Sequence, residues 1–141
     1  MRTRIKYDMA MMQSIALFER VSHAEIKDCF EDRNKYLIFV VEPGQMSKAI
    51  GRNGSTVRKL EFMLKRKIKI LEFNPEIEKF VRTLIQPSVL KDVLVDNQTL
   101  TLVSQSSEAK RLLIGRESQN LKQTKSIIQR YFDSINDIKV V

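Results

Sequence analysis

Two short segments contain the residues of this chain that are best suited to bind an anion. Residues 50–58 read Ile-Gly-Arg-Asn-Gly-Ser-Thr-Val-Arg, and residues 114–122 read Ile-Gly-Arg-Glu-Ser-Gln-Asn-Leu-Lys. Gly51 and Gly54 allow a sharp turn with positive φ, in which the backbone can lie directly against a phosphate group. A turn that opens a helix also directs unpaired N–H groups toward an anion. Both segments are therefore candidate phosphate-binding turns.

The net charge of the chain and its distribution indicate a polyanionic partner. The 25 Lys and Arg residues outnumber the 17 Asp and Glu residues, which gives a formal charge of +8 at pH 7. Between Met46 and Ile70, eight cationic residues surround the first turn, and Glu61 is the single acidic residue. A basic region centred on such a turn is typical of proteins that bind nucleic acid.

The first turn supplies backbone donors, charged side chains and apolar side chains. We expect the N–H groups around Asn53, Gly54 and Ser55 to donate to phosphate oxygens, and Ser55 or Thr56 to cap the following helix. Ile50 and Val57 either support a base or belong to the core. The cationic side chains predicted to contact phosphates are those of Lys48, Arg52 and Arg58.

The second turn, Gly115-Arg116-Glu117-Ser118, departs from the first. Ser118 replaces the second glycine, and Glu117 places a negative charge where the phosphate would lie. Either the neighbouring polar and cationic groups offset this repulsion, or Glu117 stabilises the helix N-terminus and this half serves as a structural partner. The candidate binding residues of this turn are Ile114, Gly115, Arg116, Ser118, Gln119, Asn120 and Lys122.

Hydrophobic periodicity predicts the same series of elements on both sides of Asn74-Pro75. A helix, two strands, two helices and a strand are expected in each half. In the first half they cover residues 8–21, 24–31, 35–42 and 45–50, then a helix that Ser55 or Thr56 would cap and that contains residues 57–64, and finally residues 67–73. In the second half they cover residues 76–86, 89–95, 99–103, 107–114, 118 to about 131, and 137–141. Two α+β domains, 1–73 and 74–141, follow from this repeat.

Two of the predicted helices have an apolar face that we expect to be buried. The face of helix 8–21, which Asp8 is expected to cap, contains Met9, Met12, Ile15, Ala16 and Val21. The face of the helix that follows Gly54 contains Val57, Leu60, Met63 and Leu64. No His or Cys accompanies the methionines of the first helix, so they are interpreted as core residues rather than metal ligands.

A helix, a Gly-x-x-Gly turn and a second helix beside a small sheet resemble a K-homology (KH) domain. Gly51-Arg52-Asn53-Gly54 satisfies that turn pattern. The resemblance implies that the turn clamps the backbone of about four nucleotides, with bases in an apolar groove. The element order α-β-β-α-α-β resembles the prokaryotic type of this fold. It thus implies two tandem type II KH domains, each with a three-stranded sheet covered by helices.

Other segments resemble the archaeal NusA-like transcription termination and antitermination factors, across essentially all 141 residues. These segments are Ile15-Ala16-Leu17-Phe18-Glu19-Arg20-Val21, Phe39-Val40-Val41, Ala49-Ile50-Gly51 and Arg130-Tyr131-Phe132. The resemblance implies a protein that binds single-stranded RNA during transcript elongation or termination. We expect a monomer, and a single cysteine fits a cytoplasmic protein. RNA polymerase or the elongation complex would be the larger partner, and a ribosome-associated role stays open.

Other classes of function are less well supported by the residues. His23 is the only histidine and Cys29 the only cysteine, and no nucleophile-base set or metal-ligand spacing appears. We therefore expect no catalytic residues, metal, cofactor or small-molecule substrate. The apolar run 37–41 is too short for a membrane span of about 20 residues. A duplex-DNA reader and a KH-like scaffold for protein partners remain alternatives.

Overall fold

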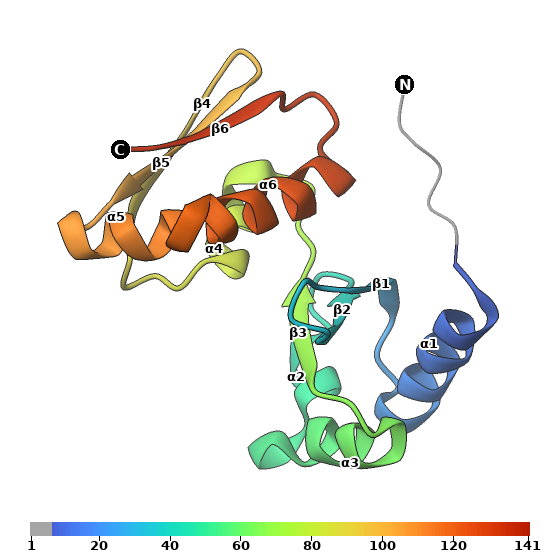
Figure 1. Ribbon diagram of the computed structural model, residues 1–141. Coiled ribbons are helices and arrows are strands. Elements are labelled where there is room, and N and C mark those ends of the chain that lie inside the picture. The colour runs from blue at the N-terminus through green and yellow to red at the C-terminus, as the bar shows by residue number, and fades with distance from the viewer. Residues whose placement is uncertain (1–6) are drawn as a thin grey trace. The chain divides into compact units, whose positions relative to one another are not determined.

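The computed structural model describes residues 7–141, so residues 1–6 of the predicted first domain lie outside the described residues. The chain divides between Asn74 and Pro75 into two compact units (Figure 1). Each unit contains one three-stranded sheet and its own helices. The predicted α+β class and element order are confirmed.

The elements of the N-terminal unit follow the predicted order closely. They are α1 (Met9–Ser22), β1 (Ile26–Glu31), β2 (Leu37–Val41), α2 (Met46–Ile50), α3 (Ser55–Leu64) and β3 (Ile68–Glu72). The short 3-10 turn η1 (Arg52–Gly54) joins α2 to α3. Asp8 caps α1 as predicted, because its carboxylate accepts a hydrogen bond of 2.7 Å from the Met11 N–H.

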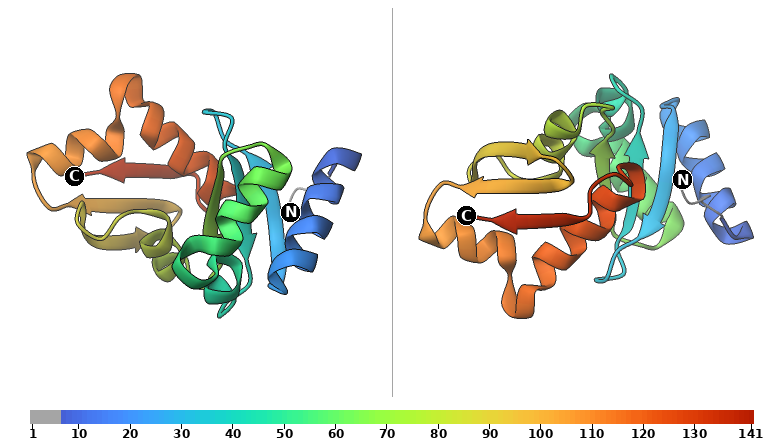
Figure 2. Two further views of the ribbon diagram at one scale, coloured as in Figure 1. Left: turned by 90° about the horizontal axis from the view of Figure 1, so that it is seen from below. Right: turned by 90° about the horizontal axis from the view of Figure 1, so that it is seen from above.

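The C-terminal unit repeats this series. Its elements are α4 (Ile77–Leu84), β4 (Leu90–Asp96), β5 (Thr99–Ser104), α5 (Ser107–Ile114), α6 (Gln119–Tyr131) and β6 (Asp137–Val140). The 3-10 turn η2 (Arg116–Ser118) joins α5 to α6, which meet at an angle in both views of Figure 2. Ser106 caps α5, since its side-chain oxygen accepts from the Ala109 N–H at 3.1 Å.

The sheet topology explains why each unit needs a helical crossover. In the order β1-β2-β3, β1 runs antiparallel to β2, and β2 runs parallel to β3. The order β4-β5-β6 has the same directions. Parallel neighbours cannot be joined by a tight hairpin, so the chain must cross over between them. The helix-turn-helix segments α2–η1–α3 and α5–η2–α6 are these crossovers, and each turn is thereby fixed relative to its sheet.

Aromatic residues form the centre of both cores. In the N-terminal unit, the rings of Phe18 and Phe39 lie 4.3 Å apart, and both side chains are fully buried. Ala49 and Leu60 pack into the same cluster and attach α2 and α3 to β2. In the C-terminal unit, Phe80 lies edge-on to Tyr131 at 5.5 Å between ring centroids. The helices that flank the turns are therefore held by buried contacts.

The predicted apolar faces of α1 and α3 were partly wrong. Met9 is 66% exposed, Met12 48% and Met63 45%, and Ala16 is also exposed. The other members of these faces, Ile15, Val21, Val57, Leu60 and Leu64, do pack in the core, where Met11 and Phe18 of α1 join them. The exposed residues lie beside buried ones, at positions that successive steps of about 100° turn toward solvent.

Candidate nucleic-acid interface

The first turn reverses the chain between α2 and α3 through residues with positive φ. Gly51 has φ 77° and ψ 172°, Asn53 has φ 54°, and Gly54 has φ 75°. The Gly54 N–H donates to the Gly51 carbonyl at 3.2 Å, and the Ser55 N–H donates to the Arg52 carbonyl. These two backbone hydrogen bonds lie within the turn and stabilise its conformation.

This hydrogen bonding corrects two predictions about the turn. The N–H groups of Gly54 and Ser55 were expected to receive phosphate oxygens, but both already donate within the turn. Neither Ser55 nor Thr56 caps α3, because the N-cap residue is Gly54 and no side-chain cap bond forms. These backbone donors hold the shape of the turn, so the side chains and the accessible glycine surface are left to contact a phosphate.

Gly51 occupies a position that accepts no other residue without rearrangement. A Cβ atom there would lie 2.2 Å from the Thr56 side-chain oxygen and 2.8 Å from the Thr56 backbone nitrogen. Its φ and ψ also fall in a region that is populated essentially by glycine alone. Gly54 is less confined, because the nearest atom to a Cβ there would be Arg58 Nη1 at 3.2 Å. Gly51 therefore sets the close approach of α2 to α3.

Cationic side chains surround the first turn and are available to a ligand. Lys48 and Arg52 are exposed and form no ion pair among the described residues. Arg58 donates from Nη1 to the Asn53 carbonyl at 2.6 Å, which supports the turn and leaves its other N–H groups for further acceptors. The exposed Asn53 side chain adds an amide donor beside Arg52.

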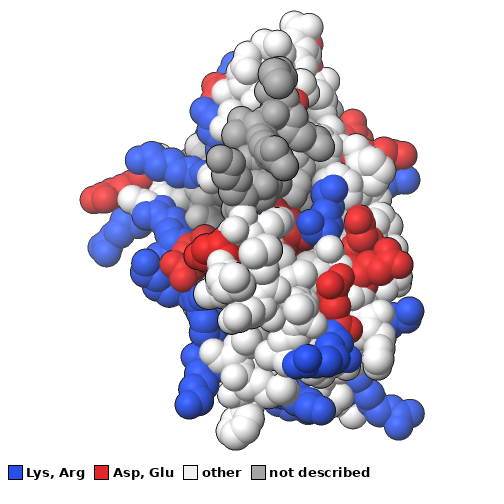
Figure 3. Space-filling model, turned by 90° about the vertical axis from the view of Figure 1, so that its right-hand side faces the viewer, with Lys and Arg blue, Asp and Glu red and all other residues white. Residues whose placement is uncertain are grey.

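Not every cation near the turn is free to bind. Arg66 contacts Glu31 at 2.6 Å, and its guanidinium lowers the pKa of that carboxyl. On the face shown in Figure 3, the lower end carries Lys and Arg side chains without Asp or Glu, whereas both kinds of side chain lie above it. This lower end is where α1, α2 and α3 lie in Figure 1.

The apolar candidates of the first turn differ in their surroundings. Val57 packs against the core cluster that contains Leu60, so the core interpretation holds for this residue. Ile50 is half-buried at the end of α2, next to Gly51. Of the two, Ile50 is the better placed to contact a base.

The second turn has nearly the same backbone as the first, although its sequence differs. Gly115 has φ 75° and ψ 172°, Glu117 has φ 54°, and Ser118 has φ 60°. The Ser118 N–H donates to the Gly115 carbonyl at 3.2 Å. Ser118 is the N-cap residue of α6, but its side chain makes no cap bond. The replacement of glycine by Ser118 therefore changes the surface of the turn and preserves its shape.

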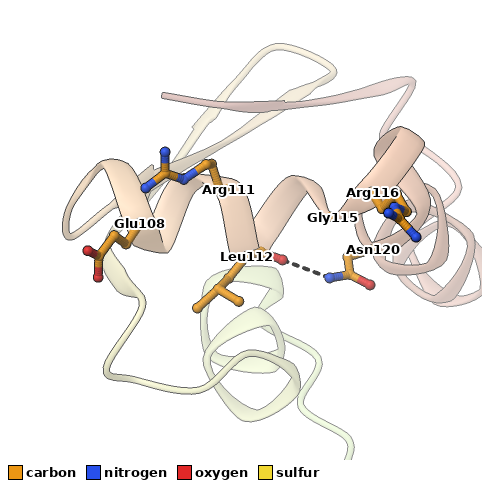
Figure 4. Close-up of a pocket in the computed structure, with 6 residues that line it drawn as sticks. All are labelled: Glu108, Arg111, Leu112, Gly115, Arg116 and Asn120. Carbon is orange, nitrogen blue, oxygen red and sulfur yellow. Dashed lines mark hydrogen bonds between the residues drawn. The ribbon is translucent and has the colours of Figure 1, made fainter.

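Asn120 packs against Gly115 in the second turn, as Thr56 packs against Gly51 in the first. A Cβ atom on Gly115 would lie 2.6 Å from Asn120 Cγ, and the Asn120 amide donates to the Leu112 carbonyl at 2.8 Å (Figure 4). Arg116 and Lys122 are exposed, and Ile114 and Gln119 are half-buried. The structure thus brings the predicted residues of the second turn together and gives Asn120 a structural role.

A hollow of about 500 Å³ lies beside the second turn. Its lining residues are Glu108, Arg111, Leu112, Gly115, Arg116 and Asn120 (Figure 4). The Leu112 side chain is 62% exposed, and Arg111 is also exposed. Sequence reasoning missed Glu108, Arg111 and Leu112. The repeat could have identified Leu112, because this residue corresponds to Lys48, a predicted binding residue of the first half.

A metal site or a membrane-spanning helix would also bear on function. Within residues 7–141, no three His, Cys, Asp or Glu side chains lie close enough together to hold a metal ion. None of the helices described has the length and hydropathy that crossing a membrane requires.

Comparison with known families identifies the first turn as part of a known domain. A family model described as "KH domain" matches residues 13–89. The match contains the whole of the first turn and ends before the second turn. The first turn, Gly51-Arg52-Asn53-Gly54, therefore lies in the segment that matches this family.

Proteins named "Probable transcription termination protein NusA" are similar over nearly the whole chain. The Halobacterium salinarum protein is 34% identical over 130 residues, which are 91% of this chain and 92% of that protein. The Halococcus morrhuae protein is 30% identical over 141 residues, covering 97% and 99%. The Thermoplasma acidophilum protein is 27% identical over 139 residues, covering 96% and 95%.

A solved structure has the same fold. It is described as "Crystal structure of APE1850", superimposes with a TM-score of 0.75, and is 23% identical in sequence. The alignment covers 96% of this chain and all of that one. The arrangement of elements is therefore shared over both units.

We predict that Gly51→Ala lowers the free energy of unfolding by more than Gly44→Ala. Both glycines have positive φ, at 77° and 83°, but a Cβ on Gly44 would meet nothing within 4 Å. Backbone strain of about 1–3 kcal/mol applies to both, whereas the clash with Thr56 applies to Gly51 alone. Urea denaturation of the two variants measures the difference. Equal reductions in stability would show that Thr56 does not confine Gly51.

Proposed function

The chain belongs to the KH-domain family and to the archaeal NusA-like proteins within it, and from this premise we propose that it binds single-stranded RNA during transcription. The first turn is the principal site. We further propose that residues 1–73 and 74–141 are tandem KH domains of the prokaryotic type. The order α-β-β-α-α-β with a three-stranded sheet in each unit supports this assignment.

The observation that carries the proposal is a glycine-confined turn with exposed cations on both sides. Lys48 comes before the turn, Arg52 lies in it, and Arg58 follows one helical turn later. Guanidinium groups bind phosphates through charge and fixed donors. The absence of side chains at Gly51 and Gly54 lets a sugar-phosphate backbone approach the chain closely. Successive phosphates of one strand can therefore be held at this surface.

Bases are proposed to lie on the Ile50 side of the turn. Ile50 is half-buried beside Gly51, so an apolar surface lies next to the phosphate contacts. Single-stranded RNA exposes base faces that a duplex hides, and KH domains hold such strands by the turn. A duplex-DNA reader is less well supported, because α3 buries Leu60 in the core and does not project as an independent reading helix.

The second turn is proposed as a weaker RNA-binding site. Its backbone matches the first turn, and Arg111, Leu112 and Arg116 line the hollow beside it. Glu117 opposes a phosphate by charge, and the Ser118 side chain stands where the first turn has none. The C-terminal unit therefore contributes less to affinity than the N-terminal unit. If Glu117 excludes RNA altogether, this unit is a structural partner.

The relatives' shared name suggests the process in which the RNA is bound. We propose a role in transcript elongation or termination, with RNA polymerase or the elongation complex as the larger partner in the cytoplasm. Binding rather than catalysis is the proposed activity, with no cofactor, and the protein acts as a monomer. A ribosome-associated role would use the same RNA contacts. A protein-interaction scaffold would show no RNA affinity.

Arg52→Asp combined with Asn53→Asp is expected to weaken RNA binding by at least about tenfold, since it replaces a charge-assisted phosphate contact by repulsion. The fold should be retained, because both side chains are exposed. Fluorescence anisotropy with a single-stranded oligoribonucleotide at several salt concentrations measures the change. The log–log salt slope should become shallower by about 0.7 for each phosphate that the variant no longer neutralises.

The matched control is Lys91→Asp combined with Asn97→Asp. These exposed residues of the β4–β5 hairpin undergo the same change in charge far along the sequence from the first turn. RNA affinity close to that of the unmodified protein is expected for this control. If both double variants lose affinity equally, general electrostatics rather than the turn holds the RNA. If neither variant nor the unmodified protein binds the oligoribonucleotide, the scaffold alternative stands.

Glu117→Asn combined with Ser118→Gly rebuilds the first turn's sequence in the second and is expected to tighten RNA binding several-fold. The backbone already has the required shape, so the change removes only the repulsive charge and a side chain. Asp96→Asn, an exposed change of the same charge, is the control. Titration with an oligoribonucleotide of about eight nucleotides tests this. Unchanged affinity in a folded variant would assign the second turn a structural role.

A further inference from the structure

The solvent face of α3 carries a large aromatic side chain that neither core uses. Phe62 is 83% exposed, which is the highest value among the exposed large hydrophobic residues described, and its neighbour Met63 is 45% exposed. A single exposed apolar residue needs no explanation. Phe62, however, lies on the helix that begins at the first turn, and its surroundings are cationic.

Helical spacing places Phe62 among positive charges on one face. Arg58 and Lys59 precede it by four and three residues, so these side chains are its neighbours on the helix surface. Lys65, also exposed, is the C-cap residue that follows the end of α3. No ion pair engages these three cations within the described part of the chain. Their charge on this face is therefore not neutralised by an acidic partner.

The one carboxylate on α3 does not compensate this charge. Glu61 is half-buried, and its side chain accepts a hydrogen bond of 3.0 Å from the Ile68 N–H at the start of β3. It therefore turns toward the sheet, where it helps to join α3 to β3. The outer face of α3 remains a positive surface with an aromatic ring at its centre.

This face continues directly from the first turn. Phe62 lies eight residues after Gly54, which corresponds to about 12 Å along the helix axis. A single strand with about 3.4 Å between stacked nucleotides covers this distance in three or four nucleotides. Arg58 stands between the two points and also contacts the turn through Asn53. A strand that leaves the turn along α3 would thus reach Phe62 without a gap in the positive surface.

We propose that Phe62 is a stacking platform for a base of the RNA beyond the nucleotides at the turn. Lys59 and Lys65 hold the phosphates on either side of that base. The platform extends the binding track along the outer face of α3, and it rests on the proposed binding of RNA at the first turn.

The chemistry of this face favours single-stranded RNA over a protein partner. Proteins that bind single strands without sequence readout combine a cationic track with aromatic rings on which bases stack. Arg58, Lys59 and Lys65 complement a polyanion, and the ring of Phe62 supplies a π-face. A protein partner of this face would have to be acidic and apolar, and it would need apolar area rather than a planar ring.

Stacking of an RNA base on Phe62 can be distinguished from apolar contact with a protein partner. The experiment measures the binding of oligoadenylates of four and ten nucleotides to the Phe62→Ala and Phe62→Leu variants. Stacking of one base on an aromatic side chain changes affinity by about fivefold or more. Both variants should therefore bind the ten-nucleotide strand at least about fivefold more weakly than the unmodified protein and bind the four-nucleotide strand equally well. Leucine keeps the apolar area but lacks the ring, so its failure to restore binding is part of the expected result.

A spectroscopic reporter gives a direct reading of the stack. The chain has no tryptophan, so Phe62→Trp introduces a unique fluorophore. Its emission should be quenched by the ten-nucleotide strand at the same concentrations that produce binding, and not when Arg52→Asp and Asn53→Asp are also present. Met12→Trp on α1, at a position 48% exposed, is the control and should not respond.

The possible outcomes distinguish the platform from the underlying proposal. Normal binding of the ten-nucleotide strand by Phe62→Ala, together with loss of binding in the Arg52 and Asn53 double variant, would overturn the platform alone. Restoration of binding by Phe62→Leu would also overturn it and would indicate apolar contact with another macromolecule. Absence of RNA binding by the unmodified protein would instead refute the function proposed for the first turn.

Discussion

In each turn, one side chain occupies the space that a Cβ atom of the first glycine would need, and this close packing determines the geometry on which the site depends. Thr56 lies against Gly51, and Asn120 lies against Gly115, in each case five residues after the glycine. This contact fixes where the second helix begins relative to the end of the first. The helices are in turn anchored by buried residues such as Ala49 and Leu60. Because the helix pair is the crossover between two parallel strands, the turn cannot move without disturbing the sheet.

The two turns show that shape and binding chemistry are encoded separately. Both have nearly the same backbone angles, although Asn53 and Gly54 correspond to Glu117 and Ser118. Asparagine, and to a lesser degree other polar residues, tolerate the left-handed conformation. Only the first glycine of the motif is required by sterics. The remaining positions are therefore free to vary in charge, as Asn53 and Glu117 do.

Sequence patterns predicted the order of elements well because the signals were local. The span of α5, the Asp8 cap and the two hairpins follow from helix capping, periodicity and turn residues that lie close together in the chain. The exposure of Met9, Met12 and Met63 did not follow, although Ile15, Val21, Val57, Leu60 and Leu64 of the same predicted faces do pack in the core. Tertiary packing alone decides which of two adjacent apolar residues is buried.

The backbone conformation of the candidate site was partly predictable from the sequence, and its hydrogen bonding was not. Glycines and cations indicate a candidate phosphate-binding turn, but they do not reveal that Gly54 and Ser55 donate their N–H groups within it. The hollow beside Leu112 was also invisible, since it depends on how α5 and α6 meet.

The formal charge of the chain does not show which of its cations are available to a polyanion. Arg66 and Lys69 are paired with Glu31 and Asp32 and serve the fold. Lys48, Arg52, Arg58, Lys59 and Lys65 have no ion-pair partner among the described residues. Like charges gathered on one surface repel each other, and this repulsion opposes folding of the unit. A bound polyanion removes it, and any ligand that binds only the folded state raises its stability. The proposed RNA binding would therefore raise the stability of the N-terminal unit through these cations.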